Sequence, residues 1–293
     1  MKEHVLLSGY TTLGTGGPAR WLGEPEEVAE LVELLARARA EGLPVAPIGL
    51  GSNLLVADEG FEGLALKLSG ELAAARAGEA TLVAGGGAPL AVCLHRARAA
   101  GLGGFEFACA IPGTVGGAVW MNAGAYGSDV SAVLTRALVA DADGAAWLAP
   151  AELGLRYRRS GLQRGEVVAR AEFHLSQRPV EDIKATVAEM QARRKAAQPT
   201  NRRTFGSVFK NPEHELTAGR MLEACGLRGH AIGGARISPK HANFIENDGD
   251  ARSADAVALI AEARRRALEQ FGVRLEPEVQ LVGALEIPPP VWG

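Results

Sequence analysis

A glycine-rich segment between Ala110 and Gly127 constrains the fold of this chain more than any other feature. It reads A-I-P-G-T-V-G-G-A-V-W-M-N-A-G-A-Y-G, with glycine at positions 113, 116, 117, 124 and 127. Glycine adopts positive φ at little cost and has no side chain to keep a ligand away, so its N–H groups can approach an anion closely. The segment therefore predicts a place where bare backbone meets a ligand.

A second glycine loop, Gly49-Leu50-Gly51-Ser52-Asn53-Leu54, follows the short apolar run 45–48. Neither loop completes a P-loop or a G-x-G-x-x-G motif. Taken alone, the second loop could be an ordinary turn after a strand. The two loops together favour converging N–H groups that bind a pyrophosphate through dipoles rather than through a basic side chain. We interpret a third cluster, Gly85-Gly86-Gly87, as mainly structural.

Composition excludes several classes of protein. The chain has 293 residues, 47% of them hydrophobic, which is enough for two or three modest domains with cores. A net charge of −3 argues against nucleic-acid binding. Three scattered cysteines and six histidines without i,i+4 pairing predict neither a disulfide framework nor a metal site. No apolar run suits a signal peptide or a membrane span, so we expect no membrane partner and a cytoplasmic location.

Hydrophobic periodicity predicts an α+β chain whose pattern of helices and strands changes near Pro179. Before that residue, the pattern predicts helices over 25–41 and 89–100 and strands over 45–48, 64–68, 81–84, 137–140, 146–148 and 167–175. After it, the pattern predicts helices over 181–194, 218–225 and 253–271 and strands over 242–246 and 279–282. We place a domain boundary at the start of this second part, between residues 178 and 179.

Eight blocks in one order along nearly the whole chain resemble a single enzyme family. They are the glycine-rich segment, T-T-L-G-T-G-G-P-A at 11–19, P-I-G-L-G-S-N-L-L-V at 47–56, Y-R-R-S at 157–160, G-S-V-F-K-N-P at 206–212, A-G-R-M-L-E-A-C-G-L at 218–227, K-H-A-N-F at 240–244 and L-E-P-E-V at 275–279. On these blocks the chain is identified as a member of the UDP-N-acetylenolpyruvoylglucosamine reductase family, whose enzymes make UDP-N-acetylmuramate for bacterial cell walls. Thr204 stands where the family often has proline, which bears on the rigidity of that loop.

The resemblance implies an α+β fold in two parts. Residues 1–178 would form an FAD-binding domain of two small α/β subdomains, about 1–66 and 67–178, of the FAD-binding type 2 or vanillyl-alcohol-oxidase-like kind. Residues 179–293 would form an α+β substrate-binding domain, whose tail, about 275–293, returns to the active site. The resemblance also implies non-covalent FAD, NADPH as co-substrate and UDP-N-acetylglucosamine enolpyruvate as the small-molecule substrate. The sequence leaves the oligomeric state open and is compatible with a monomer.

Both glycine loops hold FAD in the family that the chain resembles. Residue by residue, the resemblance implies cofactor contacts from Gly49, Gly51, Ser52, Asn53, Leu54, Ala110, Ile111, Pro112, Gly113, Thr114, Gly116, Gly117, Asn122, Ala123 and Gly124. The first loop offers Ser52 and Asn53 rather than the His or Cys that anchors flavin covalently in related oxidases.

The family's chemistry assigns roles to three further residues. Hydride addition leaves enolate-like charge on the substrate, and Ser207 matches the family's proton donor to that carbon. Preorganised positive donors stabilise such charge, and Arg158 matches the family's arginine in Y-R-x-S. We expect Arg158 and Arg159 to point to opposite faces of an extended segment. Glu278 matches a glutamate of the same centre, held protonated or hydrogen-bonded to the substrate.

These residues also have structural interpretations. Ser207 could simply open a strand, Arg158 could be a solvated charge, and Glu278 could be an exposed acid. Tyr157 belongs to the same substrate-binding block as Arg158. Lys210 and Asn211 could bind the UDP diphosphate or lie at the end of a surface strand. His241 is interpreted as structural or supporting rather than catalytic.

Two other functions compete with the reductase. One is an FAD-dependent oxidase of the same fold, and the other is a non-catalytic flavin-binding module. Fold alone does not distinguish them, so the choice depends on the site residues and on whether bound flavin turns over.

Overall fold

The computed structural model describes residues 1–290, and their contacts divide the chain into two compact units. The first unit contains residues 1–3, 21–50 and 63–194, and the second contains residues 4–20, 51–62 and the chain from Lys195 onward. Both units are therefore built from separate stretches of sequence. The predicted division into an FAD-binding domain, residues 1–178, and a substrate-binding domain, residues 179–293, assigns functions to the two parts and stays a prediction.

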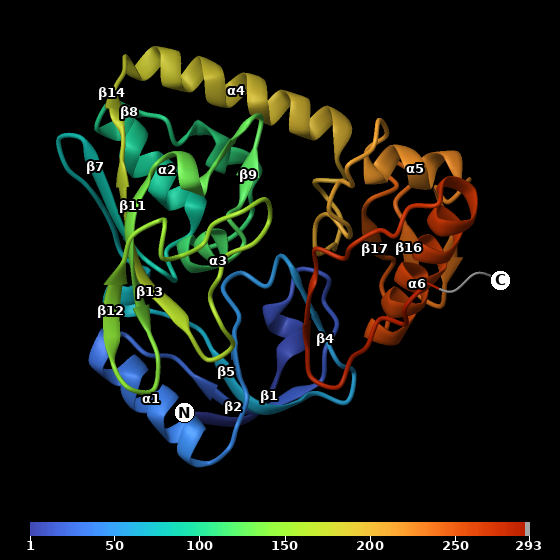
Figure 1. Cartoon of the computed structure of the whole chain (residues 1–293), viewed down its shortest axis with the longest axis horizontal. Helices are drawn as coiled ribbons and strands as arrows, with labels where there is room; N and C mark the ends of the chain where they lie inside the picture. The colour runs from blue at the N-terminus through green and yellow to red at the C-terminus, as the bar shows by residue number, and fades with distance from the viewer. Residues whose placement is uncertain (291–293) are drawn as a thin grey trace. The chain divides into compact units, whose positions relative to one another are not determined.

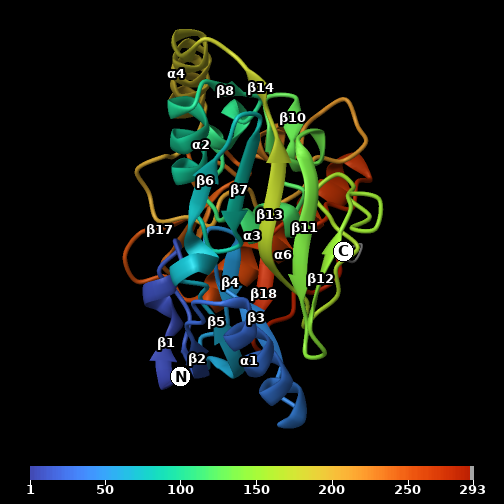
Figure 2. The ribbon, with the colours of Figure 1, turned by 90° about the vertical axis from the view of Figure 1, so that its left-hand side faces the viewer.

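The first unit is built around a five-stranded antiparallel sheet with the order β12-β11-β13-β7-β6. Figure 2 shows this sheet face on. The register places Ala171 of the central strand opposite both Ala84 and Ala137. The strands are β6 (Ala75–Ala77), β7 (Thr81–Gly85), β11 (Leu134–Ala140), β12 (Ala145–Leu148) and β13 (Val167–His174).

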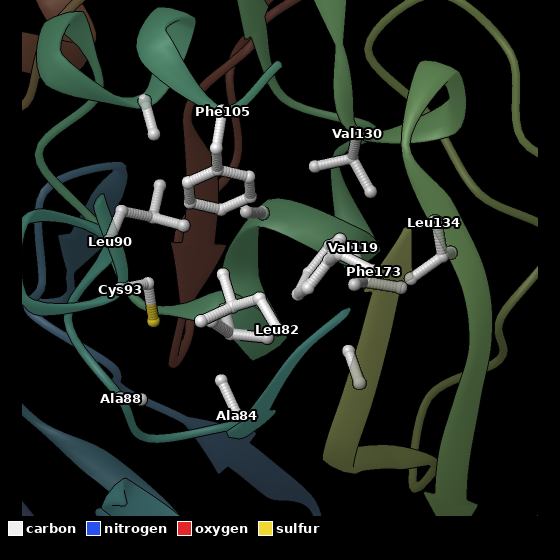
Figure 3. Packing of buried hydrophobic residues seen from close by; sticks show 14 of the residues in the cluster. Leu82, Ala84, Ala88, Leu90, Cys93, Phe105, Val119, Val130, Leu134 and Phe173 are labelled. Carbon is white, nitrogen blue, oxygen red and sulfur yellow. The ribbon is translucent and has the colours of Figure 1, made fainter. Parts of the chain in front are cut away.

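Helices cover the apolar parts of this sheet, whereas Arg136 of β11 and Glu172 of β13 form an ion pair at 2.6 Å on its partly exposed part. On one side lie α2 (Leu90–Ala99) and α3 (Val115–Trp120), which Figure 1 shows beside β7, β11 and β13. Their core contains Leu90, Cys93 and Val119 (Figure 3), and the ring of Phe105 meets that of Phe173 edge to face at 5.1 Å. A second core gathers Leu31 and Leu35 of α1 (Val28–Ala40) with Ala140, Val167 and Ala169.

The helix predicted over 25–41 and the strands predicted over 45–48 and 64–68 are confirmed, with small differences in their bounds. Helix α1 lies within the predicted 25–41, and β3 (Val45–Pro47) pairs in parallel with β5 (Phe61–Leu66). The predicted helix 181–194 is also confirmed as α4 (Val180–Ala197). The smaller elements of this part are η2 (Gly70–Ala73), β8 (Leu102–Gly103), η3 (Glu106–Ala110), β9 (Gly124–Ala125), β10 (Ser128–Asp129), η4 (Val130–Ala132) and β14 (Ser176–Gln177).

The second unit packs two helices against short strands. Helices α5 (Ala218–Ala224) and α6 (Ser253–Phe271) match the predicted helices, and they share one apolar core with a three-stranded sheet. Gly272 ends α6 in the left-handed conformation at φ 68°, where its N–H binds the carbonyl of Leu268. The sheet contains β15 (Ala231–Ile232), β16 (Ala235–Ile237) and β17 (Ile245–Asn247).

Two strands far apart in sequence also meet in the second unit. β4 (Leu54–Val56) pairs in parallel with β18 (Gln280–Val282), close to the predicted strand 279–282. The predicted strand 242–246 is wrong in its first half, because a turn occupies Ala242 and Asn243 before β17 begins. The remaining elements are β1 (Lys2–Leu6), η1 (Leu7–Tyr10) and β2 (Pro18–Gly23). Among residues 1–290, no helix is both long and apolar enough to cross a membrane.

Candidate active site

The loop that begins at Gly49 presents open backbone donors. Gly49 and Gly51 both have positive φ, at 56° and 66°, and a Cβ on Gly51 would lie 1.9 Å from the carbonyl oxygen of Tyr10. Within residues 1–290, the N–H groups of Gly49, Leu50 and Gly51 have no hydrogen-bond partner. Glycine is therefore required for the shape of the loop, and the shape leaves its donors available. Leu54 continues directly into β4.

The loop before α3 leaves a second set of donors open. Val115 and Gly116 donate their N–H groups to the carbonyls of Ala88 and Gly86, at 2.9 and 2.7 Å, which fixes the start of the helix. The N–H groups of Gly113, Thr114 and Gly117 have no partner among the described residues. Unpaired donors in the first turn of a helix favour an anion. Ala110, Ile111 and Pro112 lead into this turn from η3.

The third glycine cluster behaves differently. Gly85, Gly86 and Gly87 donate their N–H groups to backbone carbonyls, each at 2.8 Å. A Cβ on Gly86 would lie 1.8 Å from the carbonyl oxygen of Val168. These glycines allow two backbone segments to approach each other, so the structural interpretation of this cluster is confirmed.

Tyr157 and Arg158 occupy the tip of a tight turn. Arg156 and Arg159 exchange N–H···O bonds at 2.8 and 3.1 Å, and Arg158 has φ 52°. The expectation of an extended segment is therefore wrong, because positive φ at the third residue of a turn reverses the chain. The guanidinium of Arg158 donates to the carbonyl of Gly124 at 2.6 Å and lies 5.1 Å from the ring centroid of Tyr157.

Asn122 lies next to this turn and is buried. It has φ 40° and only 3% exposure. Its side chain makes hydrogen bonds through both polar atoms within the first unit. Ala123 donates its N–H to Ala118, and Gly124 accepts from Arg158. Contacts of these three residues with FAD stay a prediction.

In the second unit, the segment Ser207–Lys210 lies between two other segments. On one side Ser207 forms a bridge with Phe244, and on the other Glu278 donates its N–H to Val208 at 2.8 Å. Asn53 donates from its side chain to the carbonyl of Glu278 at 3.1 Å. Three predicted site residues, Asn53, Ser207 and Glu278, thus lie in neighbouring segments. The Ser207 hydroxyl has no hydrogen-bond partner within residues 1–290.

Two other predicted residues follow on the same segment. Lys210 forms an ion pair with Glu276 at 2.5 Å. Asn211 accepts a hydrogen bond from the N–H of Ala218 at the start of α5, at 3.1 Å. Each therefore has a structural partner, and binding of a diphosphate by these residues stays a prediction.

Two supporting residues escape the sequence analysis. The buried amide of Asn243 accepts from the Phe209 N–H at 3.0 Å and donates to the Phe209 carbonyl at 2.8 Å, which ties down the segment that carries Ser207. Thr12 donates to the carbonyl of Thr204 at 2.7 Å, so a side chain secures the loop where the family often has proline. Both residues lie in blocks singled out above, K-H-A-N-F and T-T-L-G-T-G-G-P-A, but nothing in those blocks reveals these contacts.

His241 is a partly buried residue of the same region. Its Nδ1 accepts a hydrogen bond from the N–H of Asn243 at 3.2 Å, so the ring is neutral. Burial is the main cause that lowers its pKa, and the nearby Arg228 and Arg220 act in the same direction. These contacts agree with a structural role. Within residues 1–290, no cluster of His, Cys, Asp or Glu could hold a metal ion.

Comparisons with known proteins identify the class and then the family. Residues 20–148 match the family described as "FAD binding domain", which together with the open glycine loops defines an FAD-binding protein. Residues 198–282 match "UDP-N-acetylenolpyruvoylglucosamine reductase, C-terminal domain". The chain belongs to the UDP-N-acetylenolpyruvoylglucosamine reductase family.

Its relatives match over nearly their whole length. The UDP-N-acetylenolpyruvoylglucosamine reductase of Anaeromyxobacter dehalogenans is 46% identical over 97% of this chain and 85% of its own length. The UDP-N-acetylenolpyruvoylglucosamine reductase 2 of Symbiobacterium thermophilum is 44% identical over 94% of this chain and 90% of its own length. The crystal structure of the Thermus caldophilus enzyme superposes with a TM-score of 0.83 at 39% identity and covers 95% of this chain and 97% of its own. The predicted fold class is thereby confirmed.

Proposed function

We propose that this protein is an NADPH-dependent flavoenzyme that reduces UDP-N-acetylglucosamine enolpyruvate to UDP-N-acetylmuramate, a step in peptidoglycan precursor synthesis. The observation that carries the proposal is the set of open backbone donors in the two glycine loops of a chain that is 46% identical to a named reductase. Unpaired cysteines agree with a reducing compartment, and we place the enzyme in the cytoplasm.

The glycine loops are the parts that fit FAD. The open N–H groups of Gly49, Gly51, Gly113, Thr114 and Gly117 would bind the pyrophosphate oxygens without a basic side chain. Bound FAD supplies hydride transfer, first from NADPH and then to carbon 3 of the enolpyruvyl group. Neither Ser52 nor Asn53 can attach flavin covalently, so mild denaturation should release it.

Ser207 supplies the proton that completes the reduction. Hydride addition leaves negative charge at carbon 2 of the substrate, beside a carboxylate, and a neutral hydroxyl can protonate so strong a base. The Ser207 hydroxyl has no partner among the described residues, and Asn243 and Glu278 hold the segment that follows it. The group is therefore held in place and is available to donate.

Arg158 and Glu278 act on the same charged centre. A guanidinium fixed by a bond to Gly124 provides positive charge where the enolate develops, and such preorganised charge lowers the barrier. The side chain of Glu278 would hydrogen-bond to the substrate. Tyr157, Lys210 and Asn211 would bind the UDP part, where an ammonium and an amide both recognise phosphate oxygens.

An absorbance scan of the purified protein tests this function. We expect a yellow protein with a flavin spectrum that bleaches with NADPH and returns when UDP-N-acetylglucosamine enolpyruvate is added without oxygen. A colourless protein that does not bind added FAD would overturn the assignment. Recovery of the spectrum with oxygen but not with the UDP substrate would instead identify an oxidase.

A further inference from the structure

Two hydrogen bonds join the turn at Arg158 to the segment Asn122–Gly124. Asn122 Nδ2 donates to the carbonyl of Arg156, the first residue of the turn, at 3.1 Å. Arg158 Nη2, at the tip of the turn, donates to the carbonyl of Gly124 at 2.6 Å. One short segment therefore holds both the base of the turn and the guanidinium.

The amide of Asn122 cannot rotate to the opposite orientation. Its Oδ1 accepts from the N–H of Ser131 at 2.9 Å, while its Nδ2 also donates to the carboxylate of Asp129 at 3.3 Å. Because the amide N–H of Ser131 can only donate and an ionised carboxylate can only accept, a flipped amide would lose both bonds. Asp129 and Ser131 thus aim the Nδ2 of Asn122 at the turn.

The turn needs this external support. Arg158 has φ 52°, in the left-handed region that disfavours residues other than glycine. Such a conformation persists only where its surroundings enforce it. The neighbouring Tyr157 is 54% exposed, so packing at the tip contributes little. The bond from Asn122 to Arg156 is the contact that ties the base of the turn to a buried side chain.

We propose that Asn122 is a positioning residue for Arg158: it holds the turn that presents the guanidinium to the enolate of the substrate. This inference rests on the proposed function. It gives the side chain of Asn122 a role through the turn, whereas the sequence predicts Asn122 as a cofactor contact.

The Asn122→Gly variant tests the inference, because glycine keeps positive φ and removes only the side chain. We expect turnover of UDP-N-acetylglucosamine enolpyruvate to fall by about 10–100-fold, since small displacements of a catalytic group cost up to 10²-fold. The FAD dissociation constant and the rate of flavin reduction by NADPH should stay at the wild-type values. Weaker FAD binding with equal loss in both half-reactions would overturn the inference and return Asn122 to the cofactor site.

A double-mutant comparison separates positioning from general stabilisation. Arg158→Ala should itself lower turnover by about 10²–10³-fold, as for loss of an oxyanion donor. In that background Asn122→Gly should cause no further loss, whereas in the Arg159→Ala background it should keep its full effect. Losses that multiply in the Arg158→Ala background would contradict the inference.

A second substitution covers the case in which Asn122→Gly does not fold. Asn122→Asp keeps the size of the side chain and the acceptor for Ser131 but removes the donor to Arg156. We expect the same loss of turnover with FAD binding intact, and normal turnover would overturn the inference. A wild-type protein that is yellow but does not convert the UDP substrate would refute the proposed function itself, and the positioning role with it.

Discussion

The turns at Gly85–Gly87 and at Gly113–Gly117 are both rich in glycine and both lie in the first unit, yet they use their backbone in opposite ways. All three N–H groups of the former are bound to carbonyls of the protein, and added side chains would collide with backbone. The latter leaves three N–H groups open, and a Cβ on Gly117 would approach nothing closer than 3.8 Å. Glycine density therefore marks close approach of backbone, and only the partners of the N–H groups distinguish packing from ligand binding.

The largest expected effect is on the packed turn. Gly86→Ala should lower the free energy of unfolding by more than ~3 kcal/mol, because its Cβ would overlap the carbonyl oxygen of Val168 and a bulky group forced into a packed site is among the most damaging changes. Denaturant unfolding measures this loss. Gly42→Ala is the control, since a Cβ on Gly42 would meet no atom within 4 Å; it should cost only about 1–2 kcal/mol, because Gly42 has a positive φ of 65°.

Ser207 extends the comparison from backbone to side chains, because its hydroxyl has no partner among the described residues while both polar atoms of the nearby Asn243 amide are hydrogen-bonded to Phe209. Ser207→Ala should slow reoxidation of the flavin by the UDP substrate by about 10²–10⁴-fold, as for loss of a general acid. Flavin reduction by NADPH should stay near normal, as should thermal stability. Stopped-flow measurement of the two half-reactions decides the matter, and equal damage to both would indicate a structural serine.

A substitution in the turn at 113–117 should have a smaller effect, and this effect should be on ligand binding rather than on stability. Gly117→Ala should leave the free energy of unfolding unchanged or raise it by up to ~1 kcal/mol, because alanine favours a helix over glycine and the site has room. Its methyl group would nevertheless keep a ligand from the exposed N–H groups, so FAD affinity should fall. Titration of apoprotein with FAD, beside a melting curve, checks both parts. A variant that binds FAD normally would show that the open donors serve something else.

The smallest expected effect concerns His241, whose Nδ1 is engaged by Asn243. Because burial lowers the pKa of His241 in the folded protein, the unfolded chain binds the proton more readily. The neutral ring therefore makes its full contribution to the free energy of unfolding above the ordinary pKa of about 6.5, and this contribution decreases as the pH falls below that value. The stability difference between the wild type and His241→Gln should narrow between pH 7 and pH 5. A difference that widens toward acid would contradict this assignment.

Patterns of local sequence predicted the long helices and four of the five strands of the central sheet, because periodic burial is visible in consecutive residues; the short edge strand β6 was not predicted. The turn at Arg158 could not be found in this way. Its positive φ depends on Asn122 and Gly124, more than thirty residues away in the chain. The Asn243 amide likewise pairs with Phe209 across 34 positions. The blocks contain Ser207 and Glu278, which the structure places in neighbouring segments, but the blocks do not reveal the contacts that support these residues, and the roles of the two residues stay predictions.

The pairing of β4 with β18 also governs when the second unit can be completed on the ribosome. This pair joins Leu54 to Gln280, so the strand that contains Leu54 waits for its partner while more than two hundred further residues are synthesised. Contacts between residues so distant in sequence slow folding. Every segment of the first unit has been made once Arg194 is translated, well before β18 exists. The second unit is therefore the later of the two to mature, and its early segments must avoid aggregation until the end of the chain arrives.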